Sequence, residues 1–218
     1  MSIHLITGAM FTGKTETLFK YLDRVLGNER VLLKHKHDRR YDDACVVSHM
    51  GTRFPALNVS ELKEFSKKDE FYDNLKLIAV DEGQFFPDLA EHAHQWALHG
   101  KHVVIAAIQT DLFTEPLPTI SRVIAKADRV TYLSGICTQC QGIGSFSYRK
   151  NPLPDGEDTM QRYVGGVNDY TLLCRACYQR IMHETFSNRS GMFTKKDARD
   201  RFKKSLKEFD IIPIQEAR

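Results

Sequence analysis

The fold is decided by a stretch near the start of the chain, Gly8-Ala9-Met10-Phe11-Thr12-Gly13-Lys14-Thr15. It matches in full the pattern of a phosphate-binding loop, whose glycines let the backbone wrap closely around phosphate groups. An apolar run over 3–6 comes directly before it, and apolar residues at helical spacing follow over 14–26. A strand, a glycine loop and a helix in this order predict a P-loop nucleotide site, where backbone N–H groups and a helix N-terminus face the anion.

Two side chains of this loop and a later acidic pair carry the expected chemistry. Lys14 would reach the β- and γ-phosphates of a nucleotide, and the Thr15 hydroxyl would bind Mg²⁺. Further along, an apolar run over 75–80 ends on Asp81 and Glu82. In a P-loop protein such a strand brings an Asp beside the phosphate loop, so Asp81 is the candidate for holding Mg²⁺ directly or through water. Glu82 could accept a proton from a hydroxyl group or orient a water molecule.

The remainder of this region alternates strand-like and helix-like patterns. Apolar runs over 31–33, 102–108 and 130–133 predict strands, and the patterns over 61–71 and 89–99 predict helices. Strands that alternate with helices predict an α/β fold with a mainly parallel sheet covered on both faces.

Four of the five cysteines form two C-x-x-C pairs, Cys137 with Cys140 and Cys174 with Cys177. Two such pairs can present four thiolates in the tetrahedral arrangement that suits a structural Zn²⁺. A redox-active pair and an iron–sulfur centre are the alternatives. Because the composition changes near Cys137, we expect three parts: a nucleotide-binding domain over 1–134, a zinc-binding lobe over 135–180, and a charged tail over 181–218 with a helix over 195–209.

The bulk composition excludes several classes of protein. A formal net charge of +3 on 218 residues gives no argument for a nucleic-acid or acidic-membrane partner. The longest apolar run falls far short of the roughly 20 residues that a membrane-spanning helix needs. The first residues lack the pattern of a signal peptide. We therefore expect a soluble, cytoplasmic protein.

Taken together, the ordered motifs resemble one family. Besides the phosphate loop and the C-x-x-C pairs, they are Asp38-Arg39-Arg40-Tyr41, Asp81-Glu82-Gly83-Gln84-Phe85-Phe86-Pro87-Asp88, Thr110-Asp111, and Val164-Gly165-Gly166 followed by Tyr170. Over residues 3–178 the chain resembles the zinc-containing (type II) thymidine kinases, which have a RecA-like P-loop core and a small zinc-ribbon-like lobe carrying a lasso loop. The resemblance implies transfer of the γ-phosphate of ATP to the 5′-hydroxyl of thymidine in pyrimidine deoxynucleotide salvage, with Mg²⁺ and structural Zn²⁺.

The resemblance also implies roles for single residues. Glu82 looks like the general base that takes the 5′-hydroxyl proton. Arg40 matches the family arginine near the transferred phosphoryl group, where, with Lys14, its charge would stabilise the transition state. The residues expected around ATP and Mg²⁺ are Gly8, Ala9, Met10, Phe11, Thr12, Gly13, Lys14, Thr15, Asp38, Arg39, Arg40, Asp81, Glu82, Gly83 and Gln84.

By the same resemblance, a lasso loop over 149–170 would close over the base, binding it largely through backbone groups. The expected substrate-binding residues are Met10, Phe85, Leu112, Ser147, Gln161, Arg162, Tyr163, Val164, Gly165 and Tyr170. The family usually has Phe where this chain has Leu112, and commonly Thr where it has Ser147. Phe113 is a candidate to replace the missing ring. The smaller Ser147 could enlarge the space around the 5-position of the base, which makes deoxyuridine an expected second substrate.

Family members are commonly tetramers that thymidine triphosphate inhibits, so we expect a homotetramer and feedback inhibition. A P-loop ATPase whose zinc lobe binds nucleic acid is the alternative function. It is disfavoured because the lobe carries four acidic residues among its basic ones and shows no basic stripe interleaved with aromatic residues. A non-catalytic relative is disfavoured by the intact Lys14, Arg40 and Glu82.

Overall fold

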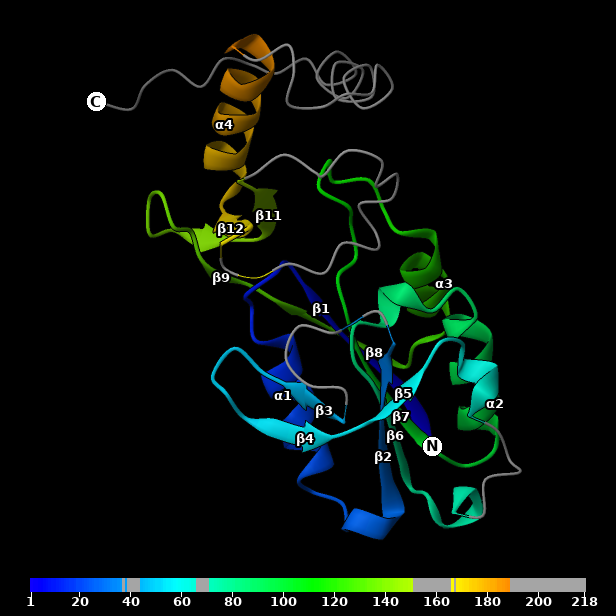
Figure 1. The fold of residues 1–218 in the computed structure, drawn as a ribbon. Coiled ribbons are helices and arrows are strands. Elements are labelled where there is room, and N and C mark those ends of the chain that lie inside the picture. Colours follow the sequence, from blue (N-terminus) through cyan, green and yellow to red (C-terminus); the bar gives the residue numbers. More distant parts are fainter. Residues whose placement is uncertain (37, 39–43, 66–70, 151–165, 167, 189–218) are drawn as a thin grey trace.

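The computed structural model describes residues 1–36, 38, 44–65, 71–150, 166 and 168–188. Within these residues the centre of the molecule is a six-stranded, wholly parallel sheet with the order β5-β2-β6-β7-β1-β8 (Figure 1). The strands are β1 Ser2–Gly8, β2 Arg30–His35, β5 Leu57–Val59, β6 Leu77–Val80, β7 His102–Ala107 and β8 Arg129–Leu133. The prediction of an α/β fold with a mainly parallel sheet is confirmed.

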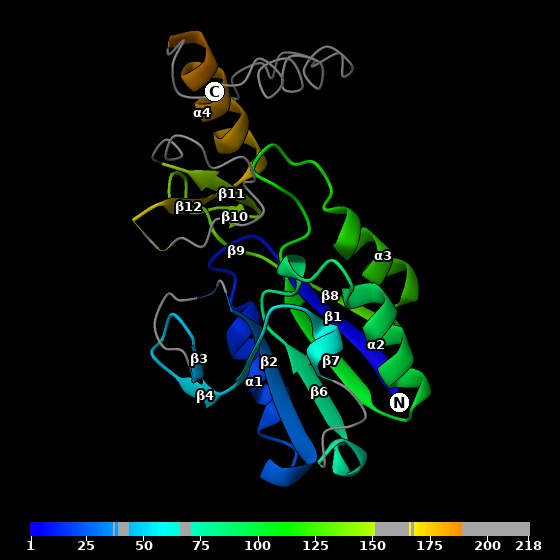
Figure 2. The same cartoon turned by 45° about the vertical axis from the view of Figure 1, so that its right-hand side comes forward.

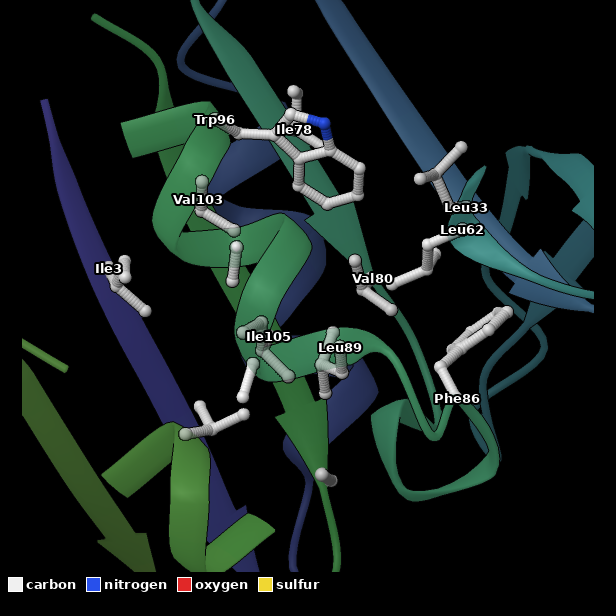
Figure 3. Packing of buried hydrophobic residues seen from close by; sticks show 14 of the residues in the cluster. Ile3, Leu33, Leu62, Ile78, Val80, Phe86, Leu89, Trp96, Val103 and Ile105 are labelled. Carbon is white, nitrogen blue, oxygen red and sulfur yellow. The ribbon is translucent and has the colours of Figure 1, made fainter. Parts of the chain in front are cut away.

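Alternating apolar residues in the strands build a core on each face of the sheet. In β7, Val103 and Ile105 belong to one core, whereas Val104 and Ala106 belong to the other. The first core is covered by α2 (Leu89–Leu98) and α3 (Pro118–Lys126), and the second by α1 (Lys14–Leu22), as Figure 2 shows. Figure 3 shows the first core, with Trp96 and Leu89 of α2 lying over the strands. Each large side chain buried there contributes about 1.5–3 kcal/mol.

Short elements surround the sheet. β3 (Cys45–Val47) and β4 (Arg53–Pro55) form an antiparallel hairpin beside α1. Single 3-10 turns lie at Gly27–Glu29, Leu62–Glu64, Tyr72–Asn74 and Gly83–Phe85. None of the helices in the described part of the chain combines the length and apolar character needed to cross a membrane.

A small lobe stands beyond the end of β1 that leads into the phosphate loop (Figures 1 and 2). Its elements are β9 Gly135–Ile136, β10 Ile143–Gly144, β11 Phe146–Arg149, β12 Tyr170–Leu173 and α4 Arg175–Asn188, with antiparallel pairs β9–β10 and β11–β12. The buried residues of its core are Phe113, Cys137, Leu173, Cys177, Tyr178 and Met182. Helix α4 crosses the position where we expected the lobe to end and the tail to begin, and the helix predicted over 195–209 lies outside the described residues.

The helix predicted over 61–71 is wrong in its described part. Only the single turn Leu62–Glu64 forms, and Phe65 leaves the helical conformation with φ −94° and ψ 105°. Its ring then packs against Tyr72 and Trp96, with ring centroids 5.9 and 5.8 Å away. Burial of one aromatic side chain between two others outweighs the small intrinsic preference for a helix.

Other boundaries differ by a few residues. The first helix ends at Leu22 instead of residue 26, the third strand begins at Leu77 instead of 75, and β7 ends at Ala107 instead of 108. Helix α3 was not predicted, although Pro118 at its first position is a common start signal.

Candidate active site and metal centre

The phosphate loop requires glycine at Gly8 for both conformation and space. Its φ is +154°, and a Cβ atom there would lie 2.3 Å from the Leu133 carbonyl oxygen and 2.8 Å from Thr12 Oγ1. Side chains of the loop then tie it together: Thr12 Oγ1 and Lys14 Nζ donate to the Ala9 carbonyl at 2.8 and 2.7 Å. The buried ammonium group of Lys14 therefore lies across the loop that it is expected to serve.

Two further contacts hold the loop from outside. Ser147 of the lobe accepts a hydrogen bond from the Met10 N–H at 2.9 Å. Phe11 has a left-handed backbone with φ 65°, and its ring lies 4.8 Å from that of His49, next to the β3–β4 hairpin. A non-glycine residue held in this conformation is typical of functional loops.

An acidic corner meets the start of α1. The Thr15 hydroxyl donates to the Asp81 carboxylate at 3.2 Å, although the two residues are 66 positions apart. Asp81 is only 2% exposed, and its N–H donates to the Leu33 carbonyl at 3.0 Å. Asp38 is also buried, and its N–H donates to the His35 carbonyl at 2.8 Å. Hydroxyl and carboxylate oxygens of this kind are the ligands that Mg²⁺ prefers.

Glu82 is held in an uncommon geometry. Its backbone is left-handed with φ 49°, and Gly83 follows in a space where a Cβ atom would meet Ile105 and Leu89 at 2.8 and 2.9 Å. The Gln84 amide nitrogen donates to the Glu82 carboxylate at 2.6 Å. The other end of that amide accepts the Ile108 N–H at 3.2 Å. Because a backbone N–H can only donate, this contact fixes the amide orientation, with its N–H₂ group toward Glu82.

Residues expected around the nucleoside lie on both the core and the lobe. Phe85 is half-buried, with its ring 5.8 Å from that of His35. Tyr170 is buried in the lobe, and Arg149 donates to its hydroxyl at 3.0 Å. Ser147 lies at the lobe–loop contact described above.

Leu112 lies in the loop that follows β7. It is half-buried, and its carbonyl accepts a hydrogen bond from the Tyr178 hydroxyl at 2.5 Å. Burial, reinforced by the charges of Asp111 and Tyr148, raises the pKa of Tyr178 above its usual value, so this hydroxyl stays protonated. The next residue, Phe113, packs into the lobe core, so its ring contributes to the packing of the lobe.

Several expected site residues lie outside the described residues. They are Arg39 and Arg40 of the Asp38 motif, and Gln161, Arg162, Tyr163, Val164 and Gly165 of the lasso loop.

The four paired cysteines come together in the lobe. The sulfur atoms of Cys137, Cys140, Cys174 and Cys177 all lie within 4.8 Å of one another, and those of Cys140 and Cys174 are 3.6 Å apart. A tetrahedral zinc site with Zn–S bonds of about 2.3 Å has sulfur–sulfur distances of about 3.8 Å. All five cysteines of the chain are free of disulfides. The cluster therefore fits a closed site for a zinc ion.

Hydrogen bonds around the cluster shift the pKa values of its thiols in opposite directions. The Cys177 N–H donates to Cys174 Sγ at 3.4 Å. Burial raises the pKa of the Cys137 thiol, but hydrogen bonds with the backbone at Cys174, Cys140 and Gln139 outweigh it and lower that pKa to about 6. The Cys174 side chain, together with burial, raises the pKa of Cys177 to about 12. A bound divalent cation would balance the charge of several adjacent thiolates.

Three contacts of this site were not expected from the sequence. They are the Gln84 bridge to Ile108, the Tyr178 bond to the Leu112 carbonyl, and the His49 ring beside Phe11. The first two end on backbone groups, which leave no side-chain pattern to find. The only available signal was position, because Gln84 lies two residues after Glu82 and Tyr178 directly follows Cys177.

Comparison with known proteins identifies relatives along most of the chain. A family model described as thymidine kinase matches residues 1–178. The thymidine kinase of Yaba monkey tumor virus is 34% identical over 181 residues, which are 82% of this chain and 95% of that protein. Thymidine kinase 1 of Dictyostelium discoideum is 32% identical over 188 residues, 84% of this chain and 79% of its own length. The thymidine kinase of Porphyromonas gingivalis is 34% identical over 182 residues, which are 82% of this chain and 85% of that protein.

Among solved structures, the ATPase DotB of Legionella pneumophila aligns over 94% of this chain and 52% of its own, with a TM-score of 0.34 and 12% identity. That likeness is too distant to bear on fold or function. The family match, in contrast, covers residues 1–178 and so spans the phosphate loop, the acidic corner and the cysteine cluster. The chain belongs to the thymidine kinase family.

Proposed function

We propose that this chain transfers the γ-phosphoryl group of ATP to the 5′-hydroxyl of thymidine. Family membership supports the reaction, and one hydrogen bond in the structure supports the proposed position of the active site. The Thr15 hydroxyl of the phosphate loop donates to the buried Asp81 carboxylate, so the loop and the acidic strand end meet at one point. Glu82 directly follows Asp81, which brings a second carboxylate to this corner.

The phosphate side of the reaction is assigned to the core. The loop N–H groups and the start of α1 would bind the phosphates, and Lys14 would turn from the Ala9 carbonyl toward the β- and γ-phosphates. Thr15 and Asp81 would hold Mg²⁺, which when bound neutralises phosphate charge. Arg40 is proposed to stabilise the transferred group.

The acceptor side is assigned to Glu82. Its carboxylate would take the proton of the 5′-hydroxyl while that oxygen forms a bond to the γ-phosphorus and the bond from phosphorus to the bridging oxygen breaks, which releases ADP. The Gln84 amide would keep this carboxylate correctly oriented, since its N–H₂ group donates to it at 2.6 Å.

The lobe is assigned to the nucleoside. Four cysteine ligands leave no open position, so we propose that Zn²⁺ is structural and holds the base of the lasso loop. Tyr170, Ser147, Leu112 and residues 161–165 would then border the base. We further propose a cytoplasmic homotetramer that acts in nucleotide salvage and is inhibited by thymidine triphosphate, as the resemblance implies.

The test is ADP formation from ATP and Mg²⁺ with thymidine, deoxyuridine, deoxycytidine, single-stranded DNA or no addition. We expect turnover with thymidine, a lower or equal rate with deoxyuridine, and background with the other three. Stimulation by single-stranded DNA but by none of the nucleosides would contradict the proposal and favour a nucleic-acid-dependent ATPase.

A further inference from the structure

The loop that joins β7 to α3 is cross-linked by hydrogen bonds between its own residues. The Asp111 N–H donates to the Glu115 carbonyl at 2.9 Å, and the Leu117 N–H donates to the Gln109 carbonyl at 2.9 Å. The Asp111 carboxylate also accepts the N–H groups of Phe113 and Glu115 at 2.8 and 2.9 Å. These bonds close the loop on itself and connect its tip to both of its ends.

The tip of this loop is attached to the lobe. Phe113 is 8% exposed and packs in the lobe core with Cys137, Leu173 and Tyr178. The Tyr178 hydroxyl, 66 residues further along the chain, donates to the Leu112 carbonyl at 2.5 Å. The position of the loop tip is therefore set by the lobe as well as by the sheet from which the loop emerges.

Tyr178 has little freedom to point elsewhere. It lies in the first turn of α4, where its N–H donates to the Cys174 carbonyl at 2.9 Å. Its ring is stacked on Phe146, with centroids 5.2 Å apart and an interplanar angle of 28°. The residue is 5% exposed. Packing and helix geometry together aim its hydroxyl at one acceptor.

We propose that Tyr178 is a positioning residue for the nucleoside pocket, whose hydroxyl fixes the Leu112 carbonyl and so keeps the half-buried Leu112 side chain in one place. This rests on the proposed function, in which Leu112 borders the nucleoside. Without the hydroxyl, the carbonyl loses a buried donor and the loop tip gains freedom. The phosphate loop does not depend on this bond, so ATP binding is spared.

The test compares Tyr178→Phe with wild type in steady-state kinetics. Phenylalanine keeps the ring stacked on Phe146, so the lobe should fold. We expect the KM for thymidine to rise roughly three- to tenfold, the scale of one net hydrogen bond, with kcat and the KM for ATP nearly unchanged. Tyr132→Phe is the matched control, because Tyr132 is 62% exposed on the edge strand β8, and should change neither constant.

A double-mutant cycle shows whether Tyr178 acts through Leu112. In a Leu112→Ala background, Tyr178→Phe should raise the thymidine KM little further, because the side chain that it positions is gone. An undiminished effect in that background would overturn the inference. So would an unchanged thymidine KM in the single variant, or a raised KM accompanied by lowered zinc content or Tm, which marks a purely structural role. Absence of thymidine-dependent turnover in wild type would instead reject the proposed function itself.

Discussion

The sheet core and the lobe are stabilised in different ways. The core buries apolar runs on both faces of the sheet, and Leu5, Ile78, Ile105 and Leu89 are among its fully buried residues. Within the described residues the lobe core has six buried residues, and two of them, Cys137 and Cys177, belong to the sulfur cluster. A cluster this small provides little hydrophobic stabilisation, so we expect the lobe to need its metal while the sheet does not.

The two regions also divide the proposed chemistry. Phosphate-binding and acid–base groups stand at the end of the sheet, on elements that are held by buried strands. The lobe residues proposed to contact the nucleoside are held by a few hydrogen bonds, such as those from Met10 to Ser147 and from Tyr178 to Leu112. Damage to the core should therefore lower kcat, whereas damage to the lobe should raise the thymidine KM.

The largest effect is expected for Glu82→Gln. The amide keeps the shape of the side chain but cannot take a proton at neutral pH, so kcat should fall by about 10²- to 10⁴-fold with a similar thymidine KM. Steady-state ADP formation measures both constants. Glu91→Gln, at a half-exposed glutamate of α2, is the control and should behave as wild type. A Glu82→Gln variant with more than about a tenth of wild-type kcat would remove Glu82 as the base.

The next effect is expected for loss of the metal cluster. Cys177→Ser removes a buried ligand, so zinc per chain should fall and the thymidine KM should rise at least about tenfold, because closed four-ligand sites contribute folding energy. ATP affinity should be retained because the phosphate loop belongs to the core. Atomic absorption and nucleotide titration give these readouts.

Cys45→Ser is the matched control for that experiment, since Cys45 lies in β3, outside the sulfur cluster. It should leave zinc content unchanged. Equal loss of ATP and thymidine binding in Cys177→Ser would contradict the division between core and lobe.

A smaller effect is expected for Gln84→Ala. Removal of the amide takes a hydrogen-bond donor from the Glu82 carboxylate and leaves its orientation less fixed, so kcat should fall about tenfold. Steady-state ADP formation tests this, with the exposed Gln95→Ala as control. An unchanged kcat would show that Gln84 does not support the base.

The smallest effect is expected for Ser147→Thr. Threonine keeps the oxygen that accepts the Met10 N–H and adds a methyl group beside the expected 5-position of the base. The ratio of kcat/KM for thymidine to that for deoxyuridine should rise by about two- to tenfold, the scale of one methyl contact. If this ratio stays level or falls, Ser147 does not contribute to the selection of the base.

The sequence predicted the short motifs better than the contacts between distant parts of the chain. The phosphate loop, the acidic strand end and the cysteine pairs are short patterns whose spacing reflects their chemistry. The helix over 61–71 failed because Phe65 packs against Trp96, a residue far along the chain. The role of Tyr178 could not be predicted, since its partner is a backbone carbonyl 66 residues away. Strand order also depends on contacts between distant parts of the chain. Strand β7 lies between β1 and β6 in the sheet. Thr15, which comes after β1, nevertheless contacts Asp81, which directly follows β6.

The most direct test of the central claim is the fate of the γ-phosphoryl group. ATP with a labelled γ-phosphorus would be incubated with Mg²⁺, thymidine and the zinc-loaded chain, and every labelled product would be identified and counted against ADP. We predict one labelled thymidine 5′-monophosphate for each ADP formed. ADP accompanied by labelled inorganic phosphate, without a labelled nucleotide product, would contradict the account.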